Sequence, residues 1–183
     1  MITVITATRP DRGHLLAEAA ESVARQTLAP ASWLIKVDHE GQGPATILND
    51  LAKQVTTPWL FRLDDDDILE RDHFEHLKPY LCGNRADIIY TWCTVEGPMQ
   101  RNKFQVPFNA DRLAVDNVIP SAAAIKTETW HKLGGYQTDA TLQRTRHEDW
   151  DLWLRALANN ATFLCVPITT WRYRLGNWDH RSL

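Results

Sequence analysis

Cysteine is scarce in this sequence, which contains only Cys82, Cys93 and Cys165 among its 183 residues. The number is odd, and no two cysteines stand in a C-x-x-C spacing. This pattern argues against a disulfide framework and against a zinc knuckle. We therefore expect three buried thiols in a reducing compartment, which favours a cytoplasmic protein.

Long hydrophobic runs and strong charge of one sign are also missing. No stretch approaches the roughly 18 apolar residues of a membrane span. The apolar start at residues 2–6 follows Met1 directly, without the basic region of a signal peptide. We therefore expect no stable membrane insertion. The formal net charge is −3, with no basic run that would indicate nucleic-acid binding. A P-loop motif is absent as well, which disfavours ordinary kinases and ATPases.

The first half of the sequence alternates apolar strand-like runs with helical spacing. Its length fits one domain with a sizeable core. The order β-α-β-α-β-α-β predicts an α/β protein with a Rossmann-like, mostly parallel sheet and helices on both faces. We expect a compact single domain over residues 1–183. The predicted strands are 2–7, Trp33–Val37, Pro58–Leu63 and Ala86–Tyr90, and the predicted helices are 14–26, 44–55 and 72–81.

The second half is less regular. Residues 91–109 indicate a hairpin or an excursion, and Val118–Ile125 a further strand. Thr127 is a candidate N-cap of a short helix that ends at Gly134-Gly135. Residues 147–159 have the pattern of an amphipathic helix, and residues 162–174 that of a strand.

Polar residues follow each of the first three predicted strands. Right-handed crossovers bring the carboxyl ends of parallel strands to one edge of the sheet, which is where ligands bind. We therefore expect Thr8-Arg9, Asp38-His39-Glu40 and Asp64-Asp65-Asp66-Asp67 at one opening.

The four successive aspartates point to a cation site. Like charges this close raise one another's pKa values unless a cation compensates them. Mg²⁺ typically combines one or two carboxylates with substrate phosphates. The alternative is a solvated acidic turn that caps the next helix.

Six segments in order resemble the family 2 glycosyltransferases of the GT-A fold. The resemblance covers nearly the whole chain. The segments are residues 2–9 for the "P-T-x-N-R" loop, 22–27 for "S-V-x-x-Q-T", 34–38 for "I-x-V-V-D-D-G-S", 49–52 with 63–67 for "N-x-G-x…x-L-D-x-D-D", 133–136 for "G-G-F", and 148–155 for "E-D-x-D-L-x-x-R".

The resemblance implies specific roles. Asp66 would coordinate Mn²⁺ or Mg²⁺, with Asp64 on the metal or the ribose, and His180 in the tail as a further ligand. Asp149 would be the catalytic base, with Glu148 and Trp150 on the acceptor side. The donor-binding residues would be Thr6, Ala7, Thr8, Arg9, Asp38, Asp64 and Asp65.

The implied function is metal-dependent, inverting sugar transfer from a nucleotide-diphosphate donor to an acceptor hydroxyl. Residues 1–90 would bind the nucleotide sugar and metal, and residues 91–183 would bind the acceptor and carry the base. A UDP-sugar is the favoured donor, and the acceptor could be a glycan, a lipid-linked sugar, a protein or a modified nucleic acid.

Two other functions remain open from the sequence. One is a nucleotidyl- or phosphotransferase, and the other is a catalytically silent module that binds nucleotide sugars. Arg172 and Arg174 share one face of the last predicted strand. They could hold a diphosphate or simply face solvent on an edge strand.

Overall fold

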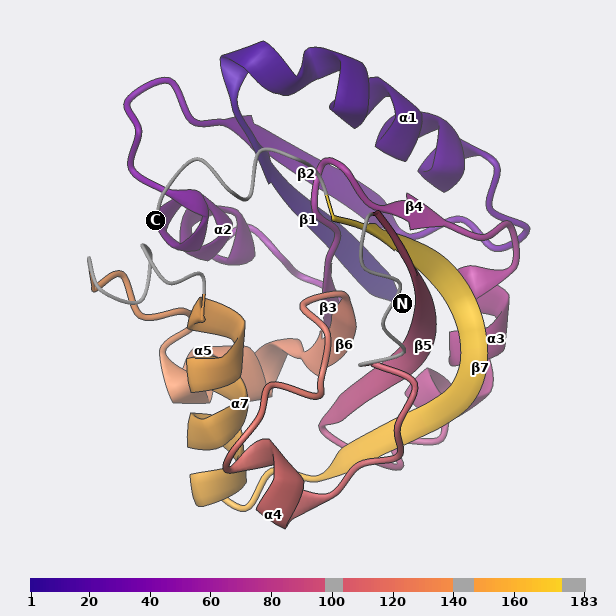
Figure 1. Cartoon of the computed structure of the whole chain (residues 1–183), viewed down its shortest axis with the longest axis vertical. Helices are drawn as coiled ribbons and strands as arrows, with labels where there is room; N and C mark the ends of the chain where they lie inside the picture. Colours follow the sequence, from indigo (N-terminus) through magenta and orange to yellow (C-terminus); the bar gives the residue numbers. More distant parts are fainter. Residues whose placement is uncertain (98–103, 140–146, 176–183) are drawn as a thin grey trace.

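A seven-stranded sheet forms the middle layer of the protein, with helices on both of its faces (Figure 1). This computed structural model describes residues 1–97, 104–139 and 147–175. The strands are β1 (Ile2–Thr8), β2 (Ser32–Val37), β3 (Trp59–Arg62), β4 (Ile68–Leu69), β5 (Ile88–Glu96), β6 (Ala123–Lys126) and β7 (Phe163–Arg174). The helices are the 3-10 turn η1 (Pro10–Arg12), α1 (Gly13–Ala24), α2 (Pro44–Ala52), α3 (His73–Cys82), α4 (Ala110–Leu113), α5 (Thr127–Leu133) and α7 (Glu148–Ala158).

The sheet is mixed, with strand order β2-β1-β3-β6-β5-β7-β4. β1 pairs in parallel with β2 and β3, and β5 pairs in parallel with β7. β6 lies antiparallel between β3 and β5, so β1, β2, β3, β5 and β7 all run in one direction. The expected α/β fold with flanking helices is confirmed, as is the shared direction of its first-half strands. The fourth predicted strand, β5, does not pair with β3, because β6 lies between them.

Strand alternation builds a separate core on each face of the sheet. Val4 and Phe61 face α1 and α3, whereas Ile5 and Leu60 face α2, α5 and α7. Successive side chains of a strand point to opposite faces. Arg62 follows Phe61, so it lies on the same face as Leu60, toward α5 and α7.

Several local predictions need correction. The strand expected at Val118–Ile125 begins only at Ala123, because residues 118–122 approach the sheet as a buried loop. Thr127 is not an N-cap, since Lys126 occupies that position and the Thr127 hydroxyl donates to the carbonyl of Thr57 (2.7 Å). The short elements β4 and α4 were not predicted.

 The three cysteines are free, but only Cys93 is buried as expected, since Cys82 is exposed and Cys165 is half-buried. No helix among the described residues has the length and apolar character needed to cross a bilayer.

A side-chain clamp joins α2 to the segment after α5. The amide nitrogen of Asn49 donates to the Tyr136 carbonyl (2.8 Å), and its oxygen accepts from the Tyr136 backbone N–H (2.9 Å). Gly134 ends α5 in the left-handed conformation, as predicted, and Gly135 continues with φ of 70°. A Cβ at Gly135 would overlap the Asn49 side-chain oxygen, whereas a Cβ at Gly134 would meet open space.

Replacing Gly135 by alanine should lower the free energy of unfolding by about 2–5 kcal/mol. The left-handed backbone penalises a Cβ by about 1–2 kcal/mol, and displacing Asn49 loses hydrogen bonds worth about 1–3 kcal/mol. Gly134→Ala is the matched control, because it has the same backbone strain without the overlap, and it should lose only the first amount. Urea denaturation measures both, and equal losses would contradict the clamp.

Candidate functional site

The carboxyl ends of β1, β2 and β3 lie side by side. The backbone N–H of Asp38 donates to the Thr8 carbonyl (2.8 Å), and that of Leu63 donates to the Ile5 carbonyl (3.1 Å). The three polar loops predicted to share one edge of the sheet therefore do so. They bring Thr8, Asp38 and the acidic run together.

The residues at the end of β1 and in the first loop differ in their burial and in their hydrogen bonds to the rest of the protein. Thr6 is buried, and its hydroxyl donates to the Leu63 carbonyl (2.8 Å) while accepting from the Trp33 indole N–H (2.9 Å). Ala7 is half-buried. Arg9 is exposed and pairs with Asp11 at 3.4 Å. Thr6 thus fixes the end of β3, whereas Arg9 faces solvent.

Asp38 orders the loop that leads into α2. Its carboxylate accepts from the backbone N–H groups of Gln42 (2.9 Å) and Gly43 (2.8 Å). Partial burial acts to raise the pKa of Asp38, but these backbone donors outweigh it and the pKa lies below its usual value. The carboxylate is therefore ionised, and its remaining lone pairs can accept from a ligand.

Arg12, at the end of η1, binds two members of the acidic run. Its Nη2 lies 2.7 Å from Asp65 Oδ1 and 2.6 Å from Asp66 Oδ2, and its Nε lies 2.9 Å from Asp65 Oδ2. The Thr8 hydroxyl donates to the same Asp65 oxygen at 2.6 Å. Asp65 is buried and faces the first loop, whereas Asp66 is less enclosed.

Arg62, the last residue of β3, connects the acidic run to α7. Its Nε and Nη2 donate to the two carboxylate oxygens of Asp64 at 2.7 and 3.2 Å. Its Nη1 donates to Glu148 Oε1 at 3.1 Å, and the guanidinium lies 5.3 Å from the centre of the Tyr136 ring. The Ser121 hydroxyl also donates to Asp64, at 3.3 Å. One buried cation therefore holds carboxylates from both halves of the chain.

Asp149 lies in the first turn of α7, next to Glu148. Its Oδ1 accepts from the Trp150 backbone N–H (2.7 Å), and its Oδ2 accepts from the Asn117 side-chain amide (3.1 Å). Burial raises the pKa of Asp149 to about 6, with Arg62 lowering it and Glu148 raising it. A carboxyl group with such a pKa is ionised at neutral pH and can still accept a proton, as a general base requires.

Burial and close spacing of the carboxylates raise pKa values in the acidic run. Burial and the neighbouring Asp64 raise the pKa of Asp66, against the opposing effect of Arg12. Burial, followed by Asp64 and Asp66, raises the pKa of Asp67 well above its usual value. Asp67 Oδ1 accepts from the Arg174 backbone N–H (3.2 Å), and its Oδ2 has no hydrogen-bond partner among the described residues. Negative charge in this run is therefore only partly compensated.

The acidic run suits a divalent cation that also binds a phosphate. Within the described ranges, no three histidine, cysteine, aspartate or glutamate side chains are placed to hold a metal ion by themselves. Mg²⁺ seldom needs such a cage, because it takes one or two carboxylates and completes its shell with water and substrate phosphate. Asp64 and Asp66 could supply hard oxygen ligands of this kind.

The remaining predicted site residues have partners in the fold or lie outside the described part. Glu148 is buried against Arg62, and the Trp150 indole N–H donates to the Leu113 carbonyl (2.8 Å). Their roles at the acceptor stay predictions. His180 lies outside the described residues.

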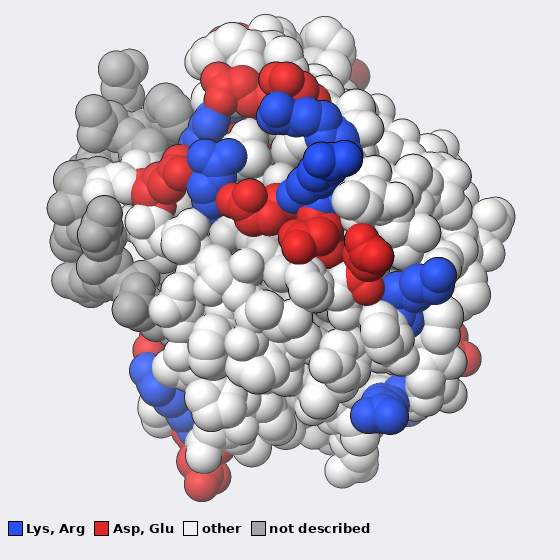
Figure 2. All heavy atoms as spheres, turned by 90° about the vertical axis from the view of Figure 1, so that its right-hand side faces the viewer, with Lys and Arg blue, Asp and Glu red and all other residues white. Residues whose placement is uncertain are grey.

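Arg172 and Arg174 belong to a network of ion pairs. Arg172 lies 3.3 Å from Glu70 and 3.2 Å from Glu96, and Arg174 lies 2.5 Å from Glu18. Figure 2 shows acidic and basic residues interleaved on this side of the molecule. The expectation that the two arginines face solvent on an edge strand is wrong, because β7 lies between β5 and β4 and both side chains form ion pairs. Their role at a diphosphate stays a prediction.

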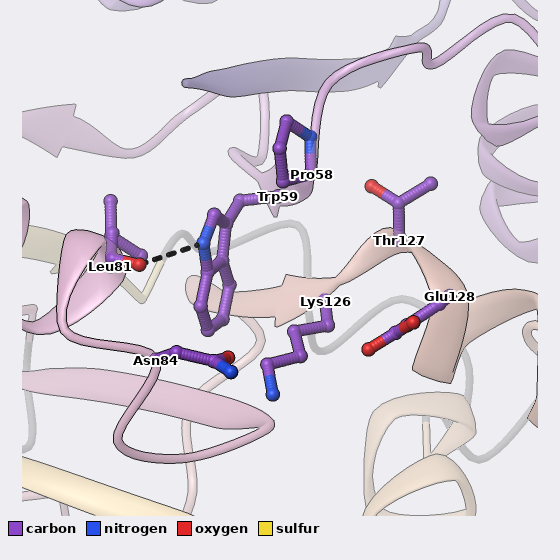
Figure 3. Close-up of a pocket in the computed structure, with 7 residues that line it drawn as sticks. All are labelled: Pro58, Trp59, Leu81, Asn84, Lys126, Thr127 and Glu128. Atoms are coloured by element: carbon purple, nitrogen blue, oxygen red, sulfur yellow. Dashed lines mark hydrogen bonds between the residues drawn. The ribbon is translucent and has the colours of Figure 1, made fainter.

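A cavity of about 340 Å³ lies at the opposite edge of the sheet (Figure 3). It is lined by Trp59, the first residue of β3, and Lys126, the last residue of the antiparallel β6. The Trp59 indole N–H donates to the Leu81 carbonyl (3.2 Å), and Lys126 pairs with Asp87 (3.0 Å). This cavity is therefore separate from the acidic run, and these two side chains are bonded within the fold.

Sequence reasoning missed three residues that shape the site: Arg12, Arg62 and Asn117. Arg62 carried a usable signal, because a charged residue within an apolar, buried strand needs an ionic partner. Arg12, at the end of η1, and Asn117, in a loop, stand in segments whose sequence does not indicate what they contact.

Comparison with solved structures shows the same fold. S. aureus TarS 1-349 in complex with UDP matches with a TM-score of 0.75 and 12% identity, covering 98% of this chain and 62% of that chain. The Pyrobaculum calidifontis mannosyltransferase PcManGT in complex with GDP-Man and Mn²⁺ matches with a TM-score of 0.66 and 14% identity, covering 96% and 57%. The chain thus spans about 60% of the length of these two structures.

Comparison with curated protein sequences found no match. The family model described as "Glycosyl transferase family 2" matches residues 17–154. This match runs from α1 into α7 and includes the acidic run, Arg62 and Asp149. Because it covers more than half of the chain, this protein belongs to glycosyl transferase family 2.

Proposed function

We propose that this chain transfers a sugar from a nucleotide-diphosphate donor to an acceptor hydroxyl, with inversion and with the help of Mn²⁺ or Mg²⁺. The observation that carries the proposal is the link through Arg62, which joins Asp64 of the acidic run to Glu148, the neighbour of Asp149. The link supports a site in which a proposed metal ligand and a proposed base act together.

The acidic run would bind the metal and the donor. Asp66 and Asp64 would be the protein ligands, and the donor diphosphate would complete the coordination shell. A bound divalent ion would offset the charge that develops on the leaving diphosphate. Thr8 and Asp38, at the ends of β1 and β2, would lie on the nucleoside side, and Asp65 would keep Arg12 in place beside them.

Asp149 would act on the acceptor. Its carboxylate would take the proton of the acceptor hydroxyl as that oxygen bonds to the anomeric carbon. The bond from this carbon to the diphosphate would break at the same time, and its electron pair would leave with the nucleoside diphosphate. Attack opposite to the leaving group inverts the anomeric centre.

The donor class is supported by the solved relatives in fold. TarS structures are described in complex with UDP and with UDP-GlcNAc, and PcManGT with GDP-Man and Mn²⁺. A UDP- or GDP-sugar is therefore the class to test first on this chain. The acceptor is left as any hydroxyl-bearing glycan, lipid-linked sugar, protein or modified nucleic acid.

The purified chain should slowly release nucleoside diphosphate from a UDP- or GDP-sugar, with water replacing the acceptor. The release should require Mn²⁺ or Mg²⁺ and stop when EDTA is added, which chromatography of the nucleotides measures. Release of nucleoside monophosphate would instead indicate a nucleotidyl- or phosphotransferase. Donor binding without any release would indicate a silent module.

Asp149→Asn should reduce donor hydrolysis by about 10²-fold or more, because general-base catalysis typically contributes 10²–10⁴-fold. Donor binding should be kept, whereas Asp66→Ala should lose metal-dependent donor binding. Asp151→Asn is the matched control, since Asp151 lies on the same helix but pairs with Arg155 at 2.8 Å. Near-normal hydrolysis by Asp149→Asn would rule out its role as base.

Donor hydrolysis should depend on pH below neutrality. Burial raises the pKa of Asp149 to about 6, so the ionised base is lost as the pH falls through 6. The value of kcat/KM should therefore fall about tenfold per unit below pH 6 and level off above it. A profile already flat at pH 5 would show that an aspartate with an ordinary pKa, or another group, controls the rate.

A further inference from the structure

Arg62 is buried, with only 7% of its surface exposed, and it is the shared partner of two carboxylates from distant parts of the chain. Asp64 lies two residues after Arg62, whereas Glu148 lies 86 residues after Arg62. Each nitrogen of its guanidinium donates to one of these carboxylates. An arginine that served only to neutralise the acidic run would not need to reach α7.

We infer that Arg62 is a positioning residue for the base: its guanidinium, held between Asp64 and Glu148, fixes the first turn of α7 against the acidic run and supplies the positive charge that Asp149 faces. This inference rests on the proposed function, in which Asp149 removes the acceptor proton. It assigns Arg62 and Glu148 a joint role that neither the metal nor the donor requires.

The geometry makes this role specific to one part of α7. Glu148 is 4% exposed and Asp149 is 8% exposed, so both residues are buried at the start of the helix. Glu148 takes the guanidinium, and Asp149 is left with the Asn117 amide and the Trp150 backbone N–H. Asp149 thus keeps lone pairs for a proton while its neighbour carries the ion pair.

The charges around Asp149 act in opposite directions. Burial raises its pKa to about 6, Arg62 lowers it, and the negative charge of Glu148 raises it. The Tyr136 and Tyr173 hydroxyls also face this region, but burial raises the pKa values of both, so they stay neutral in the working range. Arg62 and Glu148 are therefore the charged groups whose removal should change the protonation of Asp149.

The test compares three variants in a ¹³C NMR pH titration of the chain labelled at its aspartate carboxyl carbons. The Asp149 signal is identified by its loss in Asp149→Asn. Arg62→Gln should raise the pKa of Asp149 by about one unit or more, and Glu148→Gln should lower it, since nearby charges typically shift a pKa by 1–3 units. The acid limb of donor hydrolysis should move in the same two directions.

Arg155→Gln is the matched control, because Arg155 is also on α7 and contributes hydrogen bonds to Asp151, Leu133 and Gly135. It should leave the Asp149 titration unchanged even where it lowers stability. If Arg62→Gln does not fold, Glu148→Gln carries the test on its own.

An unchanged Asp149 titration in both Arg62→Gln and Glu148→Gln would overturn the inference, as would shifts in the same direction. These results are distinct from a failure of the proposed function. Absence of donor hydrolysis in the unmodified chain would remove the proposed function whatever the titration shows. Normal hydrolysis with an unmoved titration would remove only the role of Arg62.

Discussion

The guanidinium of Arg62 lies between Asp64 and Glu148 and connects the end of β3 to the start of α7. Removing one partner of a buried ion pair leaves an uncompensated charge, which typically costs about 3–5 kcal/mol. The contact therefore constrains both halves of the chain, since β3 belongs to the first and α7 to the second. A second arginine, Arg12 at the end of η1, pairs with Asp65 and Asp66 within the first half.

Sheet topology explains why these charges meet. Alternation along β3 turns Arg62 toward α5 and α7 and leaves the acidic run at the edge of the sheet where β1 and β2 also end. The antiparallel β6 beside β3 brings the preceding loop to the same edge. That loop provides Ser121 to Asp64 and Asn117 to Asp149. The one strand that breaks the parallel order thus contributes directly to the site.

The order of strands and helices along the chain could be predicted from the sequence, but which strands and side chains contact one another could not. The alternation of β-branched runs with helical spacing indicated the first four strands and the helices between them, and the motif order indicated the family. The same patterns could not predict that β6 runs antiparallel between β3 and β5. A short, continuously apolar strand such as Ala123–Lys126 has the same pattern whether it runs parallel or antiparallel to its neighbours. The partners of Arg12 and Arg62 depend on tertiary contacts, which residue spacing does not contain.

In the proposed function, ligand binding depends on charge balance at the acidic run. Arg12 and Arg62 offset part of the negative charge of Asp64, Asp65 and Asp66. Burial and the nearby Asp64 still raise the pKa of Asp66, which indicates that some of this negative charge is not compensated. A cation and a diphosphate that share this site should bind together better than either binds alone.

The most direct measurement is thermal unfolding with Mn²⁺ alone, with UDP or GDP alone, and with both. The account predicts that Mn²⁺ and one nucleotide together raise Tm by more than the sum of their separate shifts, and that Asp66→Asn removes this excess. A joint shift no larger than the sum, or an excess that survives in Asp66→Asn, would contradict it.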